Sequence, residues 1–240
     1  MAEHRIKLQS KEEVAVDTMA FHFEKPEGFQ FKAGQTAEWK LIDPPETDSE
    51  GNSRTFTIAS APYENTLMCG TRMRDSAYKR SLEKLKPGDE ILLDGPGGSF
   101  KLHNDESTPA VFLTGGIGVT AVRSILLQAL KDKVGHKLVV FYSNHRPEDA
   151  AFLEELDQSR DNNPDYTFVP TMTQMDKSDQ SWHGETGHVD KAMLEKYLDD
   201  LTKPIYYLDG PPDMVEGLFK VLTDAGVDED NIRTEEFPGY

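Results

Sequence analysis

The chain changes its hydrophobic pattern once, near residue 104, and this change limits the folds it can adopt. Before it, short β-rich runs such as TLMCGTRM alternate with turns, and one helical pattern lies around DSAYKRSLEKL. After it, wholly apolar runs such as AVFLTGG alternate with segments of helical spacing such as VTAVRSILLQALKD. The sequence therefore predicts two domains, residues 1–104 and residues 105–240.

Each pattern predicts a fold class. Short strands without long helices between them favour an N-terminal antiparallel β-barrel, because closure removes exposed strand edges. Apolar strands alternating with helices predict a C-terminal α/β domain with a doubly wound parallel sheet. Such sheets bind ligands at the carboxyl ends of their strands.

Composition narrows the function. The single cysteine, Cys69, excludes an internal disulfide, a four-cysteine zinc site and a cysteine-held iron-sulfur cluster. His183 and His188 lack a third ligand nearby, so no metal site is expected. A net charge of -17 argues against nucleic acid and anionic membranes as partners. The charged first residues and the absence of a long apolar run predict a cytoplasmic protein without a membrane span, which we expect to be a monomer.

A glycine-rich turn joins the first apolar strand to its helix. Glycines let a backbone approach a diphosphate, and a helix N-terminus presents unpaired N–H groups to it. Gly115, Gly116 and Gly118 are therefore candidates for nucleotide binding, with Thr120 as a candidate helix cap. The alternative is an ordinary tight turn.

Several motifs, taken in order, resemble those of ferredoxin-NADP reductase-like flavoenzymes. They are RTFTIAS at residues 54–60, Gly88-Asp89 followed by Gly95-Pro96, GGIGVT at residues 115–120, GPPDM at residues 210–214, and IRTEEF at residues 232–237. The resemblance implies an FAD-dependent NAD(P)H oxidoreductase, which passes hydride from nicotinamide C4 to flavin N5. Electrons would then go to a ferredoxin- or flavodoxin-type carrier protein or to a small acceptor. The alternative is a reductase component, or a redox-responsive FAD-binding subunit, without independent turnover.

The resemblance also implies roles for barrel residues. Arg54 would pair with the FAD diphosphate, Phe56 would lie against the flavin, and Thr57 would place its hydroxyl near N5. Without the resemblance, this segment is an ordinary β-strand with one surface arginine.

The next matching segment follows the strand TLMCGTRM. The resemblance places Arg72, Met73 and Arg74 under the adenosine and flavin, and the helix start at Ser76, Ala77 and Lys79 opposite the diphosphate. Ser76 and Lys79 stand where the family commonly has glycine and serine. The segment is otherwise a solvated cationic helix.

Asp209, before Gly210 and Pro211, replaces the family's cysteine near the meeting point of nicotinamide and flavin. Two roles stay open for Asp209. Its carboxylate would stabilise positive charge on nicotinamide, or it would cap the helix expected to begin at Pro211.

The C-terminal motif supplies the last catalytic candidates. Glu235 would be the family's carboxylate near the flavin, and Phe237 or Tyr240 would cover the flavin ring. A plain strand with a loose tail is the alternative.

The coenzyme, NADH or NADPH, is open as well. Asn144 and Arg146 follow the second parallel strand, and Arg146 would suit the 2′-phosphate of NADPH. However, Thr173-Gln174 stands where NADPH-specific relatives tend to have Ser-Arg, which favours NADH.

The basic residues are concentrated in one stretch. Residues 72–86 contain six basic and two acidic side chains, a local charge of +4 in an acidic chain. We expect this stretch to border the FAD diphosphate and to offer a docking face to an acidic carrier.

Overall fold

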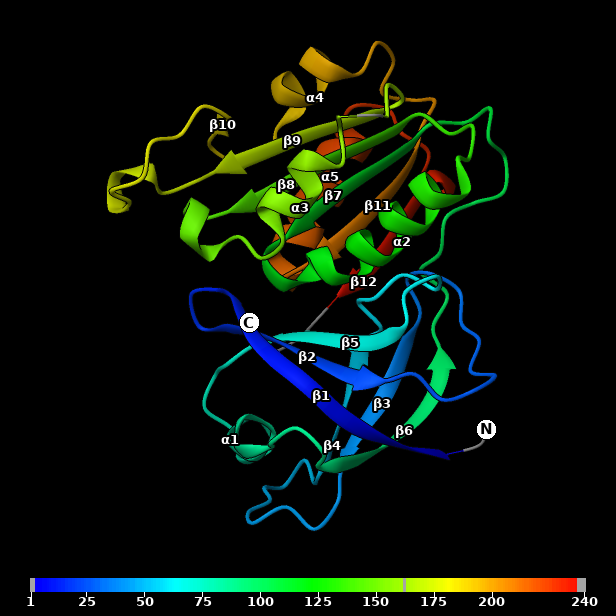
Figure 1. The fold of residues 1–240 in the computed structure, drawn as a ribbon. Helices are drawn as coiled ribbons and strands as arrows, with labels where there is room; N and C mark the ends of the chain where they lie inside the picture. Colours follow the sequence, from blue (N-terminus) through cyan, green and yellow to red (C-terminus); the bar gives the residue numbers. More distant parts are fainter. Residues whose placement is uncertain (1–2, 162, 237–240) are drawn as a thin grey trace.

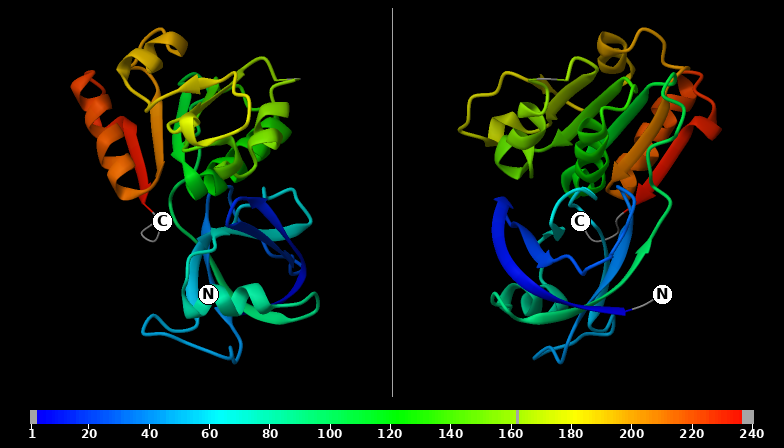
Figure 2. Two further views of the ribbon diagram at one scale, coloured as in Figure 1. Left: turned by 90° about the vertical axis from the view of Figure 1, so that its left-hand side faces the viewer. Right: turned by 45° about the vertical axis from the view of Figure 1, so that its right-hand side comes forward.

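The structure, a computed structural model, describes residues 3–161 and 163–236. Its two six-stranded sheets lie one above the other, with the N-terminal sheet below the C-terminal one in Figure 1. Figure 2 shows that the two layers stay separate from other directions and that a single connection, residues 98–109, runs between them. The connection belongs to neither sheet, so a boundary after residue 104 stays a prediction.

The N-terminal sheet is antiparallel, with the strand order β4-β3-β6-β1-β2-β5. Its edge strands β4 and β5 come into contact, so the sheet curls into the predicted barrel. Apolar side chains fill the barrel, with Phe21, Phe23 and Trp39 fully buried. The elements are β1 (Glu3–Ala15), β2 (Thr18–Glu24), β3 (Thr36–Leu41), β4 (Ser53–Thr57), β5 (Thr66–Arg72), α1 (Ala77–Lys84) and β6 (Glu90–Gly97).

The C-terminal sheet is parallel, with the order β10-β9-β8-β7-β11-β12. Helices α2 and α3 cover one face, and α4 and α5 cover the other, which confirms the doubly wound prediction. The chain order reverses between β7 and β11, which is where such sheets bind ligands. The elements are β7 (Ala110–Gly115), η1 (Gly116–Gly118), α2 (Val119–Asp132), β8 (Leu138–Asn144), η2 (Pro147–Asp149), α3 (Leu153–Gln158), β9 (Tyr166–Met172), η3 (Met175–Lys177), β10 (Glu185–Thr186), α4 (Lys191–Tyr197), β11 (Ile205–Gly210), α5 (Pro212–Asp224), η4 (Glu229–Asn231) and β12 (Ile232–Glu236).

The helical segment that follows β8 is divided into η2 and α3. Phe152 adopts a left-handed backbone conformation with φ 58° between η2 and α3. Its ring lies 5.3 Å from the guanidinium carbon of Arg123 on α2. Packing against another helix therefore accompanies a backbone break that the local pattern does not reveal. None of the described helices is long and apolar enough to cross a membrane.

A buried arginine on α2 joins the two domains. Arg123 is 5% exposed, and its Nη1 donates to the carbonyl of Ala59 and to Glu64, both at 2.9 Å. Its Nε donates to Glu155 of α3 at 2.7 Å. The next residue, Ser124, donates to the carbonyl of Ser60 at 2.8 Å. The N-terminal half of α2 is thus tied to the barrel loop after β4.

Replacing Arg123 by Met tests this connection. We expect a loss of about 3 to 5 kcal/mol in the free energy of unfolding, because two carboxylates lose their buried partner. The matched control is Arg160→Met, whose partner Asp157 is half exposed, with an expected cost of at most about 1 kcal/mol. Denaturant unfolding measures both, and equal costs for the two variants would contradict the assignment.

Candidate functional site

A cavity of about 380 Å³ lies between the barrel and the parallel sheet. The barrel contributes Arg54, Phe56, Thr57, Arg72 and Lys79 to its lining, and the parallel domain contributes Ile117, Thr120, Glu235 and Glu236. We call it the groove. The sequence candidates from both halves of the chain therefore meet at one place.

A second cavity, of about 230 Å³, lies beside the groove at the carboxyl ends of the parallel strands. Gly115, Gly116, Asn144 and Pro211 line it. We call it the strand-end cavity. Arg72 lines both cavities, so the two are neighbours.

Three of the buried side-chain polar atoms without a hydrogen-bond partner lie at the groove. Thr57 Oγ1, Arg72 Nε and Glu235 Oε2 are buried, line the groove and have no hydrogen-bond partner. A buried polar group without a partner costs free energy, so such a cluster indicates a place where a ligand supplies the missing partners.

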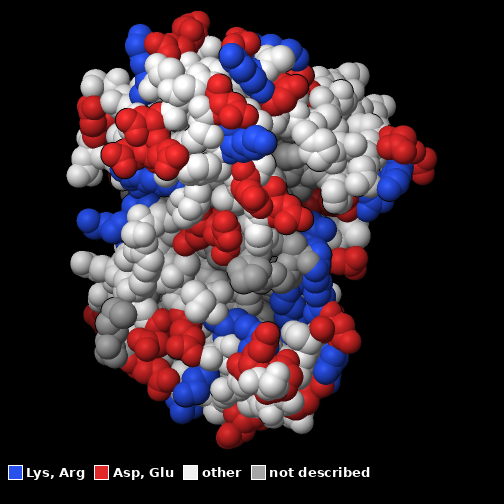
Figure 3. Space-filling view, turned by 180° about the vertical axis from the view of Figure 1, so that it is seen from behind, with Lys and Arg blue, Asp and Glu red and all other residues white. Residues whose placement is uncertain are grey.

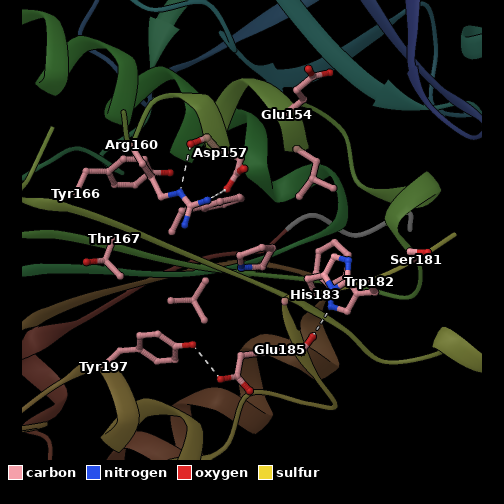
Figure 4. A pocket seen from close by; sticks show the side chains of 15 residues that line it. Glu154, Asp157, Arg160, Tyr166, Thr167, Ser181, Trp182, His183, Glu185 and Tyr197 are labelled. Atoms are coloured by element: carbon pink, nitrogen blue, oxygen red, sulfur yellow. Dashed lines mark hydrogen bonds and ion pairs between the residues drawn. The ribbon is translucent and has the colours of Figure 1, made fainter. Parts of the chain in front are cut away.

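The largest cavity, about 770 Å³, lies elsewhere, along the outer edge of β9. In Figure 4 the polar side chains around it face one another, as Arg160 does Asp157 and Tyr197 does Glu185. None of its described lining residues has a buried side-chain polar atom without a partner. It is a surface hollow without the chemistry of the groove.

Positive charge gathers around the groove. The pKa of Lys79 is lowered by burial first, and then by the charges of Arg74, Arg54 and Arg72. Lys79 donates to the carbonyl of Arg72 at 2.6 Å instead of to a carboxylate. A diphosphate would relieve this repulsion, so the cluster fits the phosphate-bearing cofactor that the resemblance implies. Figure 3 shows Lys and Arg side chains along the waist between the two halves.

Arg54 lines the groove, but its guanidinium is already engaged. Nη2 pairs with Asp48 at 3.2 Å and with Glu50 at 2.8 Å, and Nη1 donates to the carbonyl of Ser53 at 2.7 Å. To pair with a diphosphate, Arg54 would have to release these acids or bind them and the diphosphate together. The predicted pairing of Arg54 with a diphosphate stays a prediction.

Phe56 and Thr57 lie as their predicted roles require. The ring of Phe56 is half-buried and tilted against Tyr78, 5.9 Å between centroids. Thr57 is 2% exposed, and its hydroxyl is one of the unpaired groups of the groove. The roles themselves stay predictions.

Ser76 and Ala77, at the start of α1, line neither the groove nor the strand-end cavity. Ser76 accepts a hydrogen bond from the backbone N–H of Lys79 and so caps the helix. Ala77 is buried, and Met73 packs against the barrel core. Of the candidates in this segment, Arg72 and Lys79 line the groove and Arg74 lines the strand-end cavity.

Ion pairs within the chain neutralise part of the basic stretch that was predicted as a docking face. Arg80 and Lys84 both bind Glu46, at 2.6 and 3.3 Å, and Arg80 also pairs with Asp75. Glu46 lies outside residues 72–86, so a count over that stretch alone misses it. The basic stretch therefore divides into a part that lines the cavities and a part that is neutralised.

The glycine-rich turn requires glycine for two separate reasons. Gly116 has φ +53°, in the left-handed region that favours glycine. At Gly118, a Cβ would lie 2.6 Å from the carbonyl oxygen of Asp209 and 2.8 Å from its Oδ1. Thr120 does not cap α2. It lies inside the helix and donates to the carbonyl of Ile117 at 2.9 Å, so that prediction is wrong.

Gly118→Ala tests the close approach of the turn to Asp209. We expect a loss of about 1 to 3 kcal/mol in the free energy of unfolding, since backbone atoms cannot move aside cheaply. Gly217→Ala in α5 is the control, because nothing lies within 4 Å of its added Cβ and alanine favours a helix by about 1 kcal/mol. A neutral Gly118→Ala would contradict this reading.

Asp209 does not cap α5. The helix begins at Pro212, and no side chain caps it. Asp209 is 0% exposed, and neither of its oxygens has a hydrogen-bond partner. Burial, and then the charge of Glu235, raise its pKa well above the ordinary value. The capping prediction is therefore wrong. The raised pKa favours the protonated acid over the carboxylate of the other prediction, and that role stays a prediction.

Asp209→Asn tests this protonation state. A folded-state pKa above the unfolded one means that the folded protein holds the extra proton, so stability falls as pH rises above the unfolded value. Asparagine removes that pH-dependent cost. We therefore compare the Tm of the variant with that of wild type at each pH. The variant should gain stability relative to wild type between pH 5 and pH 8, and the gain should correspond to more than about 1 kcal/mol in the free energy of unfolding. The exposed Asp213→Asn should show no such difference, and a pH-independent shift for Asp209→Asn would refute a neutral acid.

Arg146 is paired with two acids and does not line the strand-end cavity. Its Nε and Nη2 bind both oxygens of Asp149, at 2.8 and 2.7 Å, and Nη1 lies 3.4 Å from Glu148. Asn144 and Asp149 are among the lining residues of this cavity, whereas Arg146 is not. The two acids follow Arg146 by two and three residues, so the sequence could have suggested this pairing.

The remaining candidates are placed as follows. Gly210 ends β11, and Pro211 lines the strand-end cavity. Phe237 and Tyr240 lie outside the described residues. His183 and His188 line different cavities, so they do not form one site.

Comparisons with known proteins agree with this architecture. Residues 112–220 match the family model for an oxidoreductase NAD-binding domain. One subunit of the Na(+)-translocating NADH-quinone reductase of Methylococcus capsulatus is 33% identical over 188 residues, which are 76% of this chain and 44% of that protein. The corresponding subunit of Pseudomonas aeruginosa is 33% identical over 159 residues, 65% of this chain and 39% of that protein. The chain thus spans less than half the length of these relatives.

Solved structures share the whole fold. The FAD/NAD-binding domain of nitric oxide dioxygenase from Vibrio cholerae superposes with a TM-score of 0.84 at 18% identity, covering 97% of this chain and 98% of that one. A ferredoxin NADP+ reductase from Neisseria gonorrhoeae, with bound FAD and NADP, gives 0.78 at 21% identity and covers 98% of each chain.

A barrel and a doubly wound NAD-binding domain that meet at a cationic groove define a two-domain reductase fold. The chain has the two-domain fold of these reductases, and its second half matches the oxidoreductase NAD-binding domain, in agreement with the resemblance of its motifs.

Proposed function

We propose that this protein is an FAD-dependent oxidoreductase that uses a reduced nicotinamide coenzyme. The observation that carries the proposal is the groove, where unpaired polar atoms and a cationic cluster from two domains surround one cavity. When bound, FAD supplies the ring that accepts hydride from the nicotinamide. The chain itself would bind and orient the flavin and the coenzyme and would exclude water from them. In well-oriented reactions such positioning lowers the activation barrier by about 7 to 11 kcal/mol.

Individual residues divide this work. Arg72 and Lys79 would hold the diphosphate by charge-assisted hydrogen bonds, and the Phe56 ring would provide a stacking face. The Thr57 hydroxyl would hydrogen-bond the reacting edge of the flavin ring. Gly115 and Gly116 would let the coenzyme backbone approach the start of α2 at the reversal point of the sheet.

The test is spectroscopic. We expect the purified protein, loaded with FAD, to be yellow, to bleach when NADH is added without oxygen, and to turn over with an artificial electron acceptor. A protein that does not bind FAD, or whose colour neither NADH nor NADPH changes, would contradict the proposal.

The proposed coenzyme is NADH. On the β8–β9 side, Ser143, Asn144, His145 and Thr173 line the strand-end cavity, and Asp149 adds an acid. Arg146, the cation suited to a 2′-phosphate, is held by two carboxylates. An arginine engaged in this way is not free to bind the 2′-phosphate, which disfavours NADPH.

We expect kcat/KM for NADH to exceed that for NADPH by more than about tenfold, or about 1.4 kcal/mol. Asp149→Asn should narrow this ratio, because it frees Arg146. Asp157→Asn, which removes a similar partner from the surface Arg160, is the control and should leave the ratio unchanged. Steady-state kinetics with both coenzymes measure it, and a wild-type preference for NADPH would overturn the assignment.

The acceptor is proposed as a carrier protein or a small oxidant. A second candidate is a reductase component of a larger assembly, because the relatives described above are subunits of a quinone reductase and extend well beyond the part that this chain matches. Turnover with an artificial acceptor favours the first, and turnover only after adding a partner favours the second.

A further inference from the structure

Three neighbouring parallel strands end in a row of polar side chains. Asp209 on β11 is in register with Thr114 on β7 and with Glu235 on β12. Side chains in register on parallel strands point to the same face, so the three are adjacent. Thr114 and Asp209 are both 0% exposed, and neither side chain has a hydrogen-bond partner. Sequence reasoning missed Thr114, which looks like one more residue of an apolar strand.

The two acids of this row differ in access to solvent. Asp209 is sealed by the turn at Gly118, whereas Glu235 lines the groove. Burial raises the pKa of Glu235 to about 7, and the pKa of Asp209 lies well above its ordinary value. Both shifts favour the protonated acids, and a pKa of about 7 places Glu235 close to its midpoint at neutral pH.

Few other charges face this pair. The barrel brings Arg54, Arg72 and Lys79 to the groove, and β12 adds the exposed Glu236. The parts of η1 and α2 that line the groove, Ile117 and Thr120, bring no charge, and β7 contributes only the Thr114 hydroxyl.

The row lies between the two cavities. Glu235 opens into the groove, and the chain that follows Thr114 and Asp209 leads into the strand-end cavity through Gly115 and Pro211. If the protein has the proposed function, the bound coenzyme would extend from the strand-end cavity into the groove, with its nicotinamide beside this row of side chains. Its ring is neutral when reduced and carries a positive charge when oxidised.

We propose that Asp209 and Glu235 form a proton-holding pair whose protonation depends on the charge of the bound nicotinamide ring. Asp209 stays a neutral acid, and Glu235 gives up its proton when the oxidised ring is bound. This inference rests on the proposed function. The proton leaves through the groove to solvent, and no bond of the coenzyme changes in this step. The physical reason is that a nearby positive charge stabilises a carboxylate, while a neutral ring does not.

Two measurements on the FAD-loaded protein test the pair. The first is the infrared band of a protonated carboxylic acid at pH 8. We expect the band in wild type and its loss in Asp209→Asn. No band in wild type, or an unchanged band in the variant, would show that Asp209 is ionised.

The second measurement is calorimetry at pH 7 in buffers of different ionisation enthalpy. The ligands are NAD⁺ and its tetrahydro form, which has an uncharged ring and cannot give hydride. NAD⁺ should release about half a proton more than the tetrahydro form, as a group at its midpoint requires. Glu235→Gln should abolish this difference, and Asp213→Asn, an exposed acid on α5, should keep it.

The outcomes separate the two claims. Equal proton release for both ligands in wild type, or a difference that survives Glu235→Gln, overturns the proton-holding pair and leaves the proposed function intact. If neither ligand binds the FAD-loaded protein, the coenzyme site fails and this proposal fails with it.

Discussion

The buried guanidinium of Arg123 is the interaction on which the arrangement of the molecule depends. A single side chain of α2 binds a carbonyl and a carboxylate of the barrel together with a carboxylate of α3. A charge this deeply buried is tolerated only when all its partners are in place, so it favours one relative position of the domains. The same helix begins at the glycine-rich turn, and the anchor therefore also sets the distance between that turn and the barrel wall.

The groove is the result of this arrangement. Polar atoms that the fold leaves unpaired, such as Thr57 Oγ1 and Glu235 Oε2, come from different domains and meet only because the domains are joined. Two of the cations that line it, Arg72 and Lys79, have no carboxylate partner among the described residues, and burial together with the neighbouring arginines lowers the pKa of Lys79. Both features cost stability in the protein alone and become favourable beside an anionic, hydrogen-bonding cofactor.

The sequence predicted the two sheets because each has its own hydrophobic period, and it predicted the groove residues through ordered motifs. The sequence did not predict the role of a side chain where that role depends on contacts made only in the folded protein. Thr120 has the right residue type for a cap but lies two residues after the N-cap position, Gly118. Asp209 precedes a helix, but its side chain lies against the turn at Gly118. Thr114 could not be recognised, because its importance arises from a register between strands about 95 residues apart.

The central claim is that the groove between the domains holds the flavin. A crystal structure of the protein with bound FAD tests it most directly. The account predicts flavin density in the cavity bounded by Phe56, Thr57 and Glu235, with the diphosphate beside Arg72 and Lys79. Flavin density in the larger hollow along β9, or an FAD-loaded protein whose groove stays empty, would contradict it.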